Sequence, residues 1–91
     1  MIDIAAELAA DNPKQSAVTL RIYADALRSY LDAADNVRRH GNVVVHPRTG
    51  APVVNPCLAI MASTAKQLAT MPRVKADRVI RLVEESTDSA K

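Results

Sequence analysis

The segment from residue 14 to residue 40 contains no Gly and no Pro, and its apolar side chains recur at alternating steps of three and four residues. This spacing places them on one face of an α-helix. At 1.5 Å per residue the helix would be roughly 40 Å long. A helix of that length in a chain of 91 residues has to pack against another long helix. The apolar face is formed by Leu20, Tyr23, Leu27, Tyr30, Ala34 and Val37.

Both ends of this helix carry local signals. Asn12-Pro13 is typical of an N-cap followed by a first helical residue, and Ser16 is a competing cap. Residues 38–40 are Arg-Arg-His, whose positive charge suits the carboxyl end of the helix dipole. Gly41 then supplies the left-handed residue that commonly ends a helix.

Residues 43–54 change from a helical to a strand pattern. Two β-branched runs, residues 43–45 and 53–54, flank a turn that contains Pro47 and Gly50. Pro suits the second position of a type I turn, and Gly suits the left-handed position after it. We predict a β-hairpin or an extended arm over residues 43–54. Two strands alone are marginal in water, so the hairpin must pack on a helix or on another subunit, or stay mobile.

Three further helices are predicted around these elements. A short one covers residues 2–10, and a longer one covers residues 56–70, begun by the cap pair Asn55-Pro56 and ended by Pro72. The last covers residues 73–86 and is followed by a polar tail at 87–91. The fold class is therefore mainly α: a single domain over residues 1–91, built as an antiparallel helical hairpin with a small β-hairpin between its two long helices.

The core of such a domain is thin. Hydrophobic residues make up 48% of the chain, but aromatic residues only 2%, with no Phe and no Trp. Small domains bury a modest share of their surface. We therefore expect part of the core to lie between subunits of a homo-oligomer. The residues expected in this core or oligomer stripe are Leu20, Tyr23, Leu27, Tyr30, Val37, Leu58, Met61 and Leu68.

Charge is unevenly distributed along the chain. Residues 1–35 hold six acids against three bases, whereas residues 36–83 hold eight bases against a single Asp. A basic block of this size indicates a nucleic acid or another acidic surface as partner, with a merely solvated face as the alternative. The candidate DNA contacts are first Arg73, Lys75, Arg78 and Arg81, of which the last three form a stripe on the predicted final helix, and second Arg38, Arg39 and Arg48.

No catalytic constellation is recognisable. His40 and His46 lack a third metal ligand at useful spacing, and Cys57 at a helix start is more typical of a small buried residue than of a reactive thiol. Tyr23 and Tyr30 lie in the apolar stripe, so core packing is favoured over base stacking. We expect a protein that is not an enzyme and has no cofactor and no metal. Without a signal peptide or a membrane segment, a cytoplasmic location is expected.

The order of these elements resembles one family of tailed-phage terminase small subunits. The matching residues are 23–30 (Tyr-Ala-Asp-Ala-Leu-Arg-Ser-Tyr), 37–41 (Val-Arg-Arg-His-Gly), the valine pairs around Arg48-Thr49-Gly50, and 55–60 (Asn-Pro-Cys-Leu-Ala-Ile). The resemblance covers about residues 16–71. Family members usually continue into a Gly-Leu-Thr-Pro-like turn followed by Arg, where this chain has only Met71-Pro72-Arg73 and Lys75. The chain is also short for the family.

The resemblance implies a packaging protein of a phage or prophage in a bacterial host cell. Such proteins form ring oligomers, recognise double-stranded viral DNA and regulate the large terminase subunit, which holds the ATPase and nuclease. Two alternatives remain open from the residues alone. One is a helical-hairpin module or small phage-encoded regulator that binds only protein. The other is a dimeric repressor or antitoxin, although no helix–turn–helix pattern is present.

Overall fold

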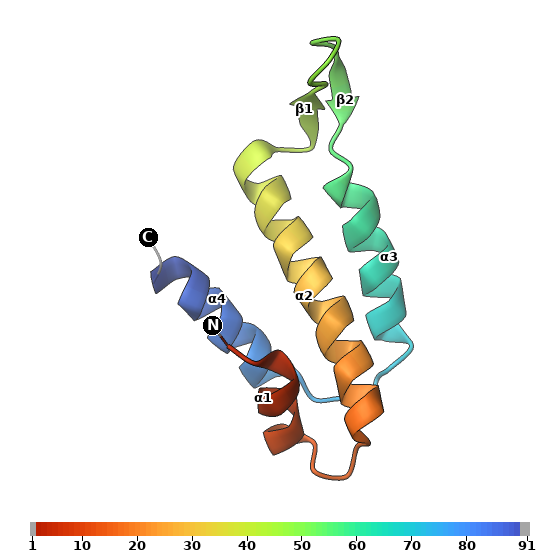
Figure 1. The fold of residues 1–91 in the computed structure, drawn as a ribbon, viewed down its shortest axis with the longest axis vertical. Coiled ribbons are helices and arrows are strands. Elements are labelled where there is room, and N and C mark those ends of the chain that lie inside the picture. Colours follow the sequence, from red (N-terminus) through yellow and green to blue (C-terminus); the bar gives the residue numbers. More distant parts are fainter. Residues whose placement is uncertain (1, 90–91) are drawn as a thin grey trace. The chain divides into compact units, whose positions relative to one another are not determined.

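The computed structural model describes the backbone of residues 2–89 and the side chains of residues 2–85. These residues form a mainly helical structure with one β-hairpin (Figure 1). The prediction of a hairpin between two long helices is confirmed. In chain order the elements are α1 (Ile4–Asp11), α2 (Ala17–His40), β1 (Val43–Val45), β2 (Pro52–Val54), α3 (Cys57–Ala69) and α4 (Asp77–Ser89).

The chain divides into two compact units, and α2 runs through both. Unit 1 comprises the residues up to Asp25 and those from Met71 onward, so it contains α1, the start of α2 and α4. Unit 2 comprises Ala26–Thr70, which is the remainder of α2, the hairpin and α3. None of the helices within the described residues has the length and apolarity that a bilayer crossing requires.

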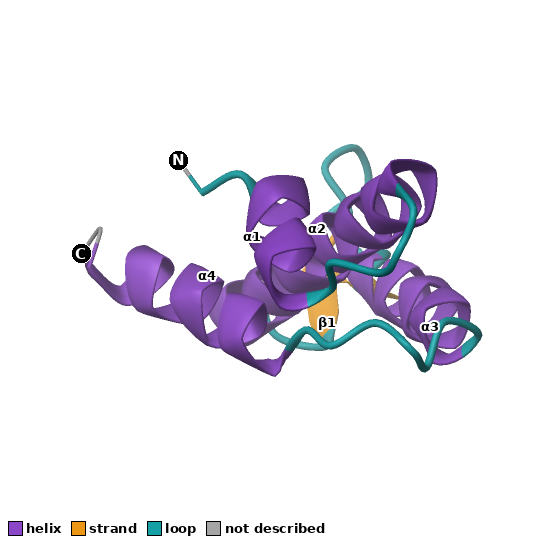
Figure 2. Cartoon of the chain, turned by 90° about the horizontal axis from the view of Figure 1, so that it is seen from below, coloured by secondary structure: helices purple, strands orange, loops and turns teal. Residues whose placement is uncertain are grey.

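In unit 1, α1 is a short amphipathic helix that packs against α4 (Figure 2). The Asp3 carboxylate caps α1 by accepting a hydrogen bond from the Ala6 N–H at 3.1 Å. Ile4 and Leu8, one turn apart, are 5% and 0% exposed. Because both lie on one face, α1 places its apolar side in the core of unit 1.

The long helix α2 begins later than the sequence predicts. Asn12 does not cap it; Asn12 is instead the C-cap of α1, and its backbone N–H donates to the Leu8 carbonyl at 2.9 Å. The cap of α2 is the alternative, Ser16, whose hydroxyl accepts a hydrogen bond from the Thr19 N–H at 3.1 Å. The physical reason is that the Asn12 side chain has partners elsewhere in unit 1, described below.

The final helix also begins later, at Asp77 rather than residue 73. Residues 73–76 precede it as an irregular segment, and the hydrogen bond from the Ile80 N–H to the Ala76 carbonyl, at 2.8 Å, marks its first turn. The helix continues to Ser89, so residues 87–89 are not the predicted tail. Residues 90–91 lie outside the described part of the chain. Val74, Ala76, Val79 and Val83 are all buried, so the segment and α4 both contribute to the core of unit 1.

In unit 2, the part of α2 from Ala26 onward packs beside α3, and the hairpin extends from the end they share (Figure 1). The strands pair antiparallel in the register Val43↔Val54, Val44↔Val53 and Val45↔Pro52. Gly41 ends α2 at φ +84° and Gly50 closes the turn at φ +72°, both in the left-handed region predicted for them. α3 begins at Cys57, one residue after the predicted start.

Burial differs along the predicted apolar stripe. Its first members, Leu20, Tyr23 and Leu27, are 3%, 8% and 2% exposed. Burial raises the pKa of Tyr23, and the nearby Asp77 carboxylate raises it further. The remaining members are half-buried, namely Tyr30, Val37, Leu58, Met61 and Leu68.

Candidate nucleic-acid interface

The predicted basic stripe on the last helix is not continuous. Lys75 lies in the segment before α4, so only Arg78 and Arg81 of the three belong to the helix. Arg73 lies in the same segment as Lys75. The side chains of all four predicted first-choice contacts are on the surface of unit 1.

The Arg78 side chain forms ion pairs with two acidic residues of α1. Its guanidinium contacts the Glu7 carboxylate at 2.9 Å and the Asp11 carboxylate at 2.8 Å, and it also donates to the Glu7 carbonyl oxygen at 3.2 Å. The hydrogen bonds to Asp11 and then to Glu7 raise the pKa of Arg78 above its ordinary value. One cation thus faces two anions, so this group of side chains carries a net negative charge and holds α1 to α4.

Arg81 has a different environment on the same helix. No hydrogen bond or ion pair of its side chain is recorded among the described side chains. It is exposed, although Asp77, Glu84 and Glu85 lie one turn away on α4. Arg81 is therefore available to a phosphate, in partly acidic surroundings.

Arg73 and Lys75 lie beside the loop between α1 and α2. The Asn12 side chain accepts a hydrogen bond from the Lys75 N–H at 2.8 Å and donates to the Lys75 carbonyl at 2.9 Å. It also donates to the Leu8 carbonyl at 2.9 Å, and Asn12 is only 6% exposed. Asn12 therefore uses its amide as a bracket between segments 63 positions apart in sequence. This pairing explains why the residues around Lys75 lie outside α4. The Lys75 N–H and carbonyl both bond to the Asn12 side chain and not to backbone groups of a helix.

The second-choice contacts lie in unit 2. Arg38 and Arg39, in the last turn of α2, both pair with Asp35, Arg39 at 2.6 Å. The hydrogen bond from Arg38 is the main cause that lowers the pKa of Asp35, and the Arg39 charge contributes as well. Arg48 is exposed in the hairpin turn, where its backbone N–H donates to His46 Nδ1 at 3.1 Å. The structure thus places Arg48 on the hairpin and the two arginine–aspartate pairs on α2.

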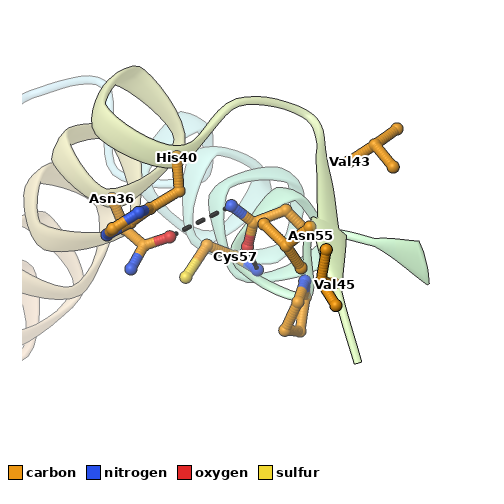
Figure 3. Close-up of a pocket in the computed structure, with 8 residues that line it drawn as sticks. Asn36, His40, Val43, Val45, Asn55 and Cys57 are labelled. Carbon is orange, nitrogen blue, oxygen red and sulfur yellow. Dashed lines mark hydrogen bonds between the residues drawn. The ribbon is translucent and has the colours of Figure 1, made fainter. Parts of the chain in front are cut away.

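Asn55 anchors the hairpin to the helices of unit 2. Its side chain donates to Asn36 Oδ1 at 3.0 Å and accepts from the Cys57 N–H at 2.9 Å (Figure 3). It also donates to the Gly41 carbonyl at 3.0 Å. Asn55 is 2% exposed. One amide therefore joins α2, its terminating Gly and the first turn of α3. The sequence predicted Asn55 as the N-cap of α3; in the structure Pro56 holds that position, and Asn55, one residue earlier, accepts from the first N–H of the helix. The sequence contained no signal for the contacts with Asn36 and Gly41.

An open hollow lies beside this anchor, lined by Asn36, His40, Val43, Val44, Val45, Asn55, Pro56 and Cys57 (Figure 3). Cys57 is half-buried and His40 is exposed. Within the described part of the chain, no three His, Cys, Asp or Glu side chains gather where they could hold a metal ion. The described polar side-chain atoms that are buried all have hydrogen-bond partners, so the hollow has no buried polar group without a partner.

Comparison with known proteins assigns the family. Residues 2–73 match the family model described as phage terminase, small subunit. Since the match spans most of the chain, this protein belongs to the phage terminase small subunit family, whose members are non-catalytic components of phage DNA packaging. No curated protein and no solved structure gave a significant match. The match confirms the resemblance seen in the sequence, and it ends at Arg73, so Lys75, Arg78 and Arg81 lie beyond it.

Proposed function

We propose that this chain recognises viral double-stranded DNA for packaging and does so through individual exposed cations of unit 1. The observation that carries the proposal is the exposure of Arg73, Lys75 and Arg81 without an ion-pair partner among the described side chains. Cations left unpaired by the protein are those that can replace the counterions of phosphates. Such contacts position a protein on the duplex more than they read its sequence.

The pairing of the remaining arginines divides the predicted contacts into two groups. Arg78, Arg38 and Arg39 would have to give up carboxylate partners before they could bind phosphate. Arg48 in the hairpin turn has no carboxylate partner among the described side chains and is a second contact, in unit 2. We therefore assign the main role to Arg73, Lys75 and Arg81, and auxiliary roles to Arg48, Arg38, Arg39 and Arg78.

The test is the salt dependence of binding to a labelled DNA duplex. Three phosphate contacts per subunit predict that log K falls with log salt at a slope of about −2.7 for each subunit in contact with the duplex. Replacing Arg73 and Arg81 together by Ala should bring the slope to about −0.9. Lys66→Ala, which removes an exposed cation of α3 in unit 2, is the matched control and should leave it unchanged. Affinity that does not vary with salt would contradict the proposal and favour a module that binds only protein.

We further propose that the protein acts as a homo-oligomer in the form of a ring. The support comes from apolar side chains left on the surface of unit 2. Val43, Val45 and Val54 of the hairpin are 59%, 69% and 69% exposed, and Ile60 of α3 is 43% exposed. Exposed apolar groups gathered on a small unit are typical of an interface. Light scattering on a sizing column should find one species of many subunits, and a clean monomer would contradict this part.

Membership of this family also leads us to expect a protein partner. That partner is the large terminase subunit, which holds the ATPase and nuclease. We propose that this chain binds the large subunit and regulates it. Adding the protein to purified large subunit with DNA should change the ATPase rate, and the two should elute together. An unchanged rate with no shared elution would exclude this role.

A further inference from the structure

Two loops of unit 1 lie against each other and together hold three basic side chains. One loop is residues 12–16, between α1 and α2, and the other is residues 71–76, before α4. They contain Lys14, Arg73 and Lys75 and no Asp or Glu. We name this pair of loops the basic loop pair. Lys14 belongs to the acidic N-terminal part of the sequence, so no charge pattern along the chain connects it with the other two.

The contact between the loops is specific rather than incidental. Asn12 binds both the N–H and the carbonyl of Lys75, at 2.8 Å and 2.9 Å. Farther along, the Gln15 side chain donates to the Arg73 carbonyl in a longer bond of 3.5 Å. Two bonded positions on each loop hold them in register. Lys14 lies between Asn12 and Gln15, so it is held next to the segment from Arg73 to Lys75.

The loops are also restricted in conformation. Each contains a Pro directly before a basic residue, Pro13 before Lys14 and Pro72 before Arg73. Proline fixes one backbone angle and so lowers the freedom a loop loses on binding. Each loop also contains a tight backbone bond, from the Gln15 N–H to the Asn12 carbonyl at 3.1 Å and from the Val74 N–H to the Met71 carbonyl at 3.3 Å.

Two acids flank the loops: Asp11 precedes the first loop, and the exposed Asp77 follows the second loop as the first residue of α4. Asp11, directly before the first loop, is bound by Arg78 at 2.8 Å, and the same guanidinium binds Glu7. Arg78 therefore offsets part of the negative charge beside the first loop, because its guanidinium is shared between Asp11 and Glu7. Lys14, Arg73 and Lys75 are all exposed, and no side-chain ion pair is recorded for them among the described residues. The loop pair is thus a small basic surface with no acid of its own.

We infer that the basic loop pair is a phosphate-binding surface for the DNA backbone, that Lys14 is one of its contacts, and that Asn12 is the residue that positions it. This inference rests on the proposed DNA-binding function and adds a residue and a location to it. Its ligand is the phosphodiester backbone of duplex DNA, bound by Lys14 and Lys75 as point charges and by the guanidinium of Arg73.

The test compares Lys14→Ala with Lys66→Ala in the full chain, using the labelled duplex over a range of salt. Both variants remove one exposed lysine, from unit 1 and unit 2 respectively. Lys14→Ala should make the salt slope less negative by about 0.9 for each subunit in contact, and Lys66→Ala should not change it. Equal effects of the two lysines, or none from Lys14 while the unaltered protein binds, would overturn the inference and leave the proposed function in place. A protein that binds no DNA at any salt would refute both.

A double-mutant cycle tests the role of Asn12. Asn12→Ala removes the bracket, so Lys14 should lose its alignment with Arg73 and Lys75. Lys14→Ala should then change the slope by clearly less in the Asn12→Ala background than in the unaltered protein, since the two sites are coupled. A purely structural role for Asn12 would lower stability and leave the effect of Lys14→Ala intact. If Asn12→Ala does not fold, the comparison of Lys14 with Lys66 still decides whether Lys14 contacts DNA.

Discussion

Unit 1 and unit 2 use the same kinds of residues in different ways. In unit 1, α1, the start of α2 and α4 bury a set of apolar side chains that includes Leu8 and Val79, both 0% exposed. In unit 2, the buried apolar residues are Ala26, Leu27 and Ala33, whereas the valines of the hairpin lie mostly on the surface. The buried residues that organise unit 2 are polar as well, above all Asn55.

We infer from this difference that the two units have different roles. A unit with a filled apolar core is held by its own packing, and its polar brackets and basic loops are supported by that core. A unit whose strands and helix leave apolar groups in water has surface to offer to another chain. On this basis we propose that the DNA contacts lie mainly in unit 1 and that the hairpin of unit 2 takes part in subunit contacts.

The largest effect is expected from a core substitution in unit 1. Leu8→Ala removes a side chain that is 0% exposed and leaves a cavity. It should lower the free energy of unfolding by about 2–5 kcal/mol, measured by urea denaturation. Val18→Ala, at a position 69% exposed, is the control and should change it by less than about 0.5 kcal/mol. Similar losses for both would mean that α1 does not form part of a packed core.

The next effect is expected at the polar anchor of unit 2. Asn55→Ala removes the acceptor for the Cys57 N–H and the donors to Asn36 and Gly41. A loss of about 2 kcal/mol in unfolding free energy is expected, because several hydrogen bonds of a buried side chain disappear together, one of them to the first N–H of α3. Hydrogen exchange should become faster in residues 43–54. Unchanged exchange there would show that the hairpin is held without Asn55.

Substitution of the hairpin valines should change the stability of the fold little and should clearly weaken the assembly of subunits. Val45→Thr combined with Val54→Thr changes two side chains that are each 69% exposed. Surface changes of this kind alter the unfolding free energy by less than about 0.5 kcal/mol each. If these valines lie between subunits, the mass by light scattering should fall. Retention of the full mass would remove this face of the hairpin from the interface.

The smallest effect is expected at Asp35. Its pKa is lowered in the folded state, mainly by the hydrogen bond from Arg38. Stability from this pairing is therefore present above the ordinary Asp pKa of about 3.9 and is lost as the pH falls through the lower folded value. Asp35→Asn should give a slightly lower melting temperature at neutral pH and no difference in strong acid. The effect is small because the arginines are exposed. A difference that persists in acid would point to another cause.

Much of the fold could be predicted because its signals are local. The long Gly-free and Pro-free run, the left-handed glycines at residues 41 and 50, and the valine pairs each act within a few residues of their own position. Their energetics depend on backbone angles and on side-chain spacing, which a sequence displays directly. The family could also be recognised at this level, since the order of these signals matches it.

The candidate site could be predicted only in part, and the differences have one cause. Asn12 is of a residue type that commonly caps helices, yet its side-chain amide binds the backbone of Lys75, 63 positions away. Arg78 follows the spacing of a basic stripe, yet its charge is used on Glu7 and Asp11 of another helix. Lys14 lies in an acidic region of the sequence, yet the next residue, Gln15, donates to the Arg73 carbonyl.

Local backbone preferences and apolar periodicity therefore already specify the helices, the turns and the hairpin. Packing decides which polar groups remain free. A side chain can bond with any partner within reach, and folding brings such partners together from distant positions in the sequence. A hydrogen bond or an ion pair depends on atoms a few ångströms apart. The free cations of this surface, and so its proposed DNA contacts, emerge only when α1 and α4 have come together.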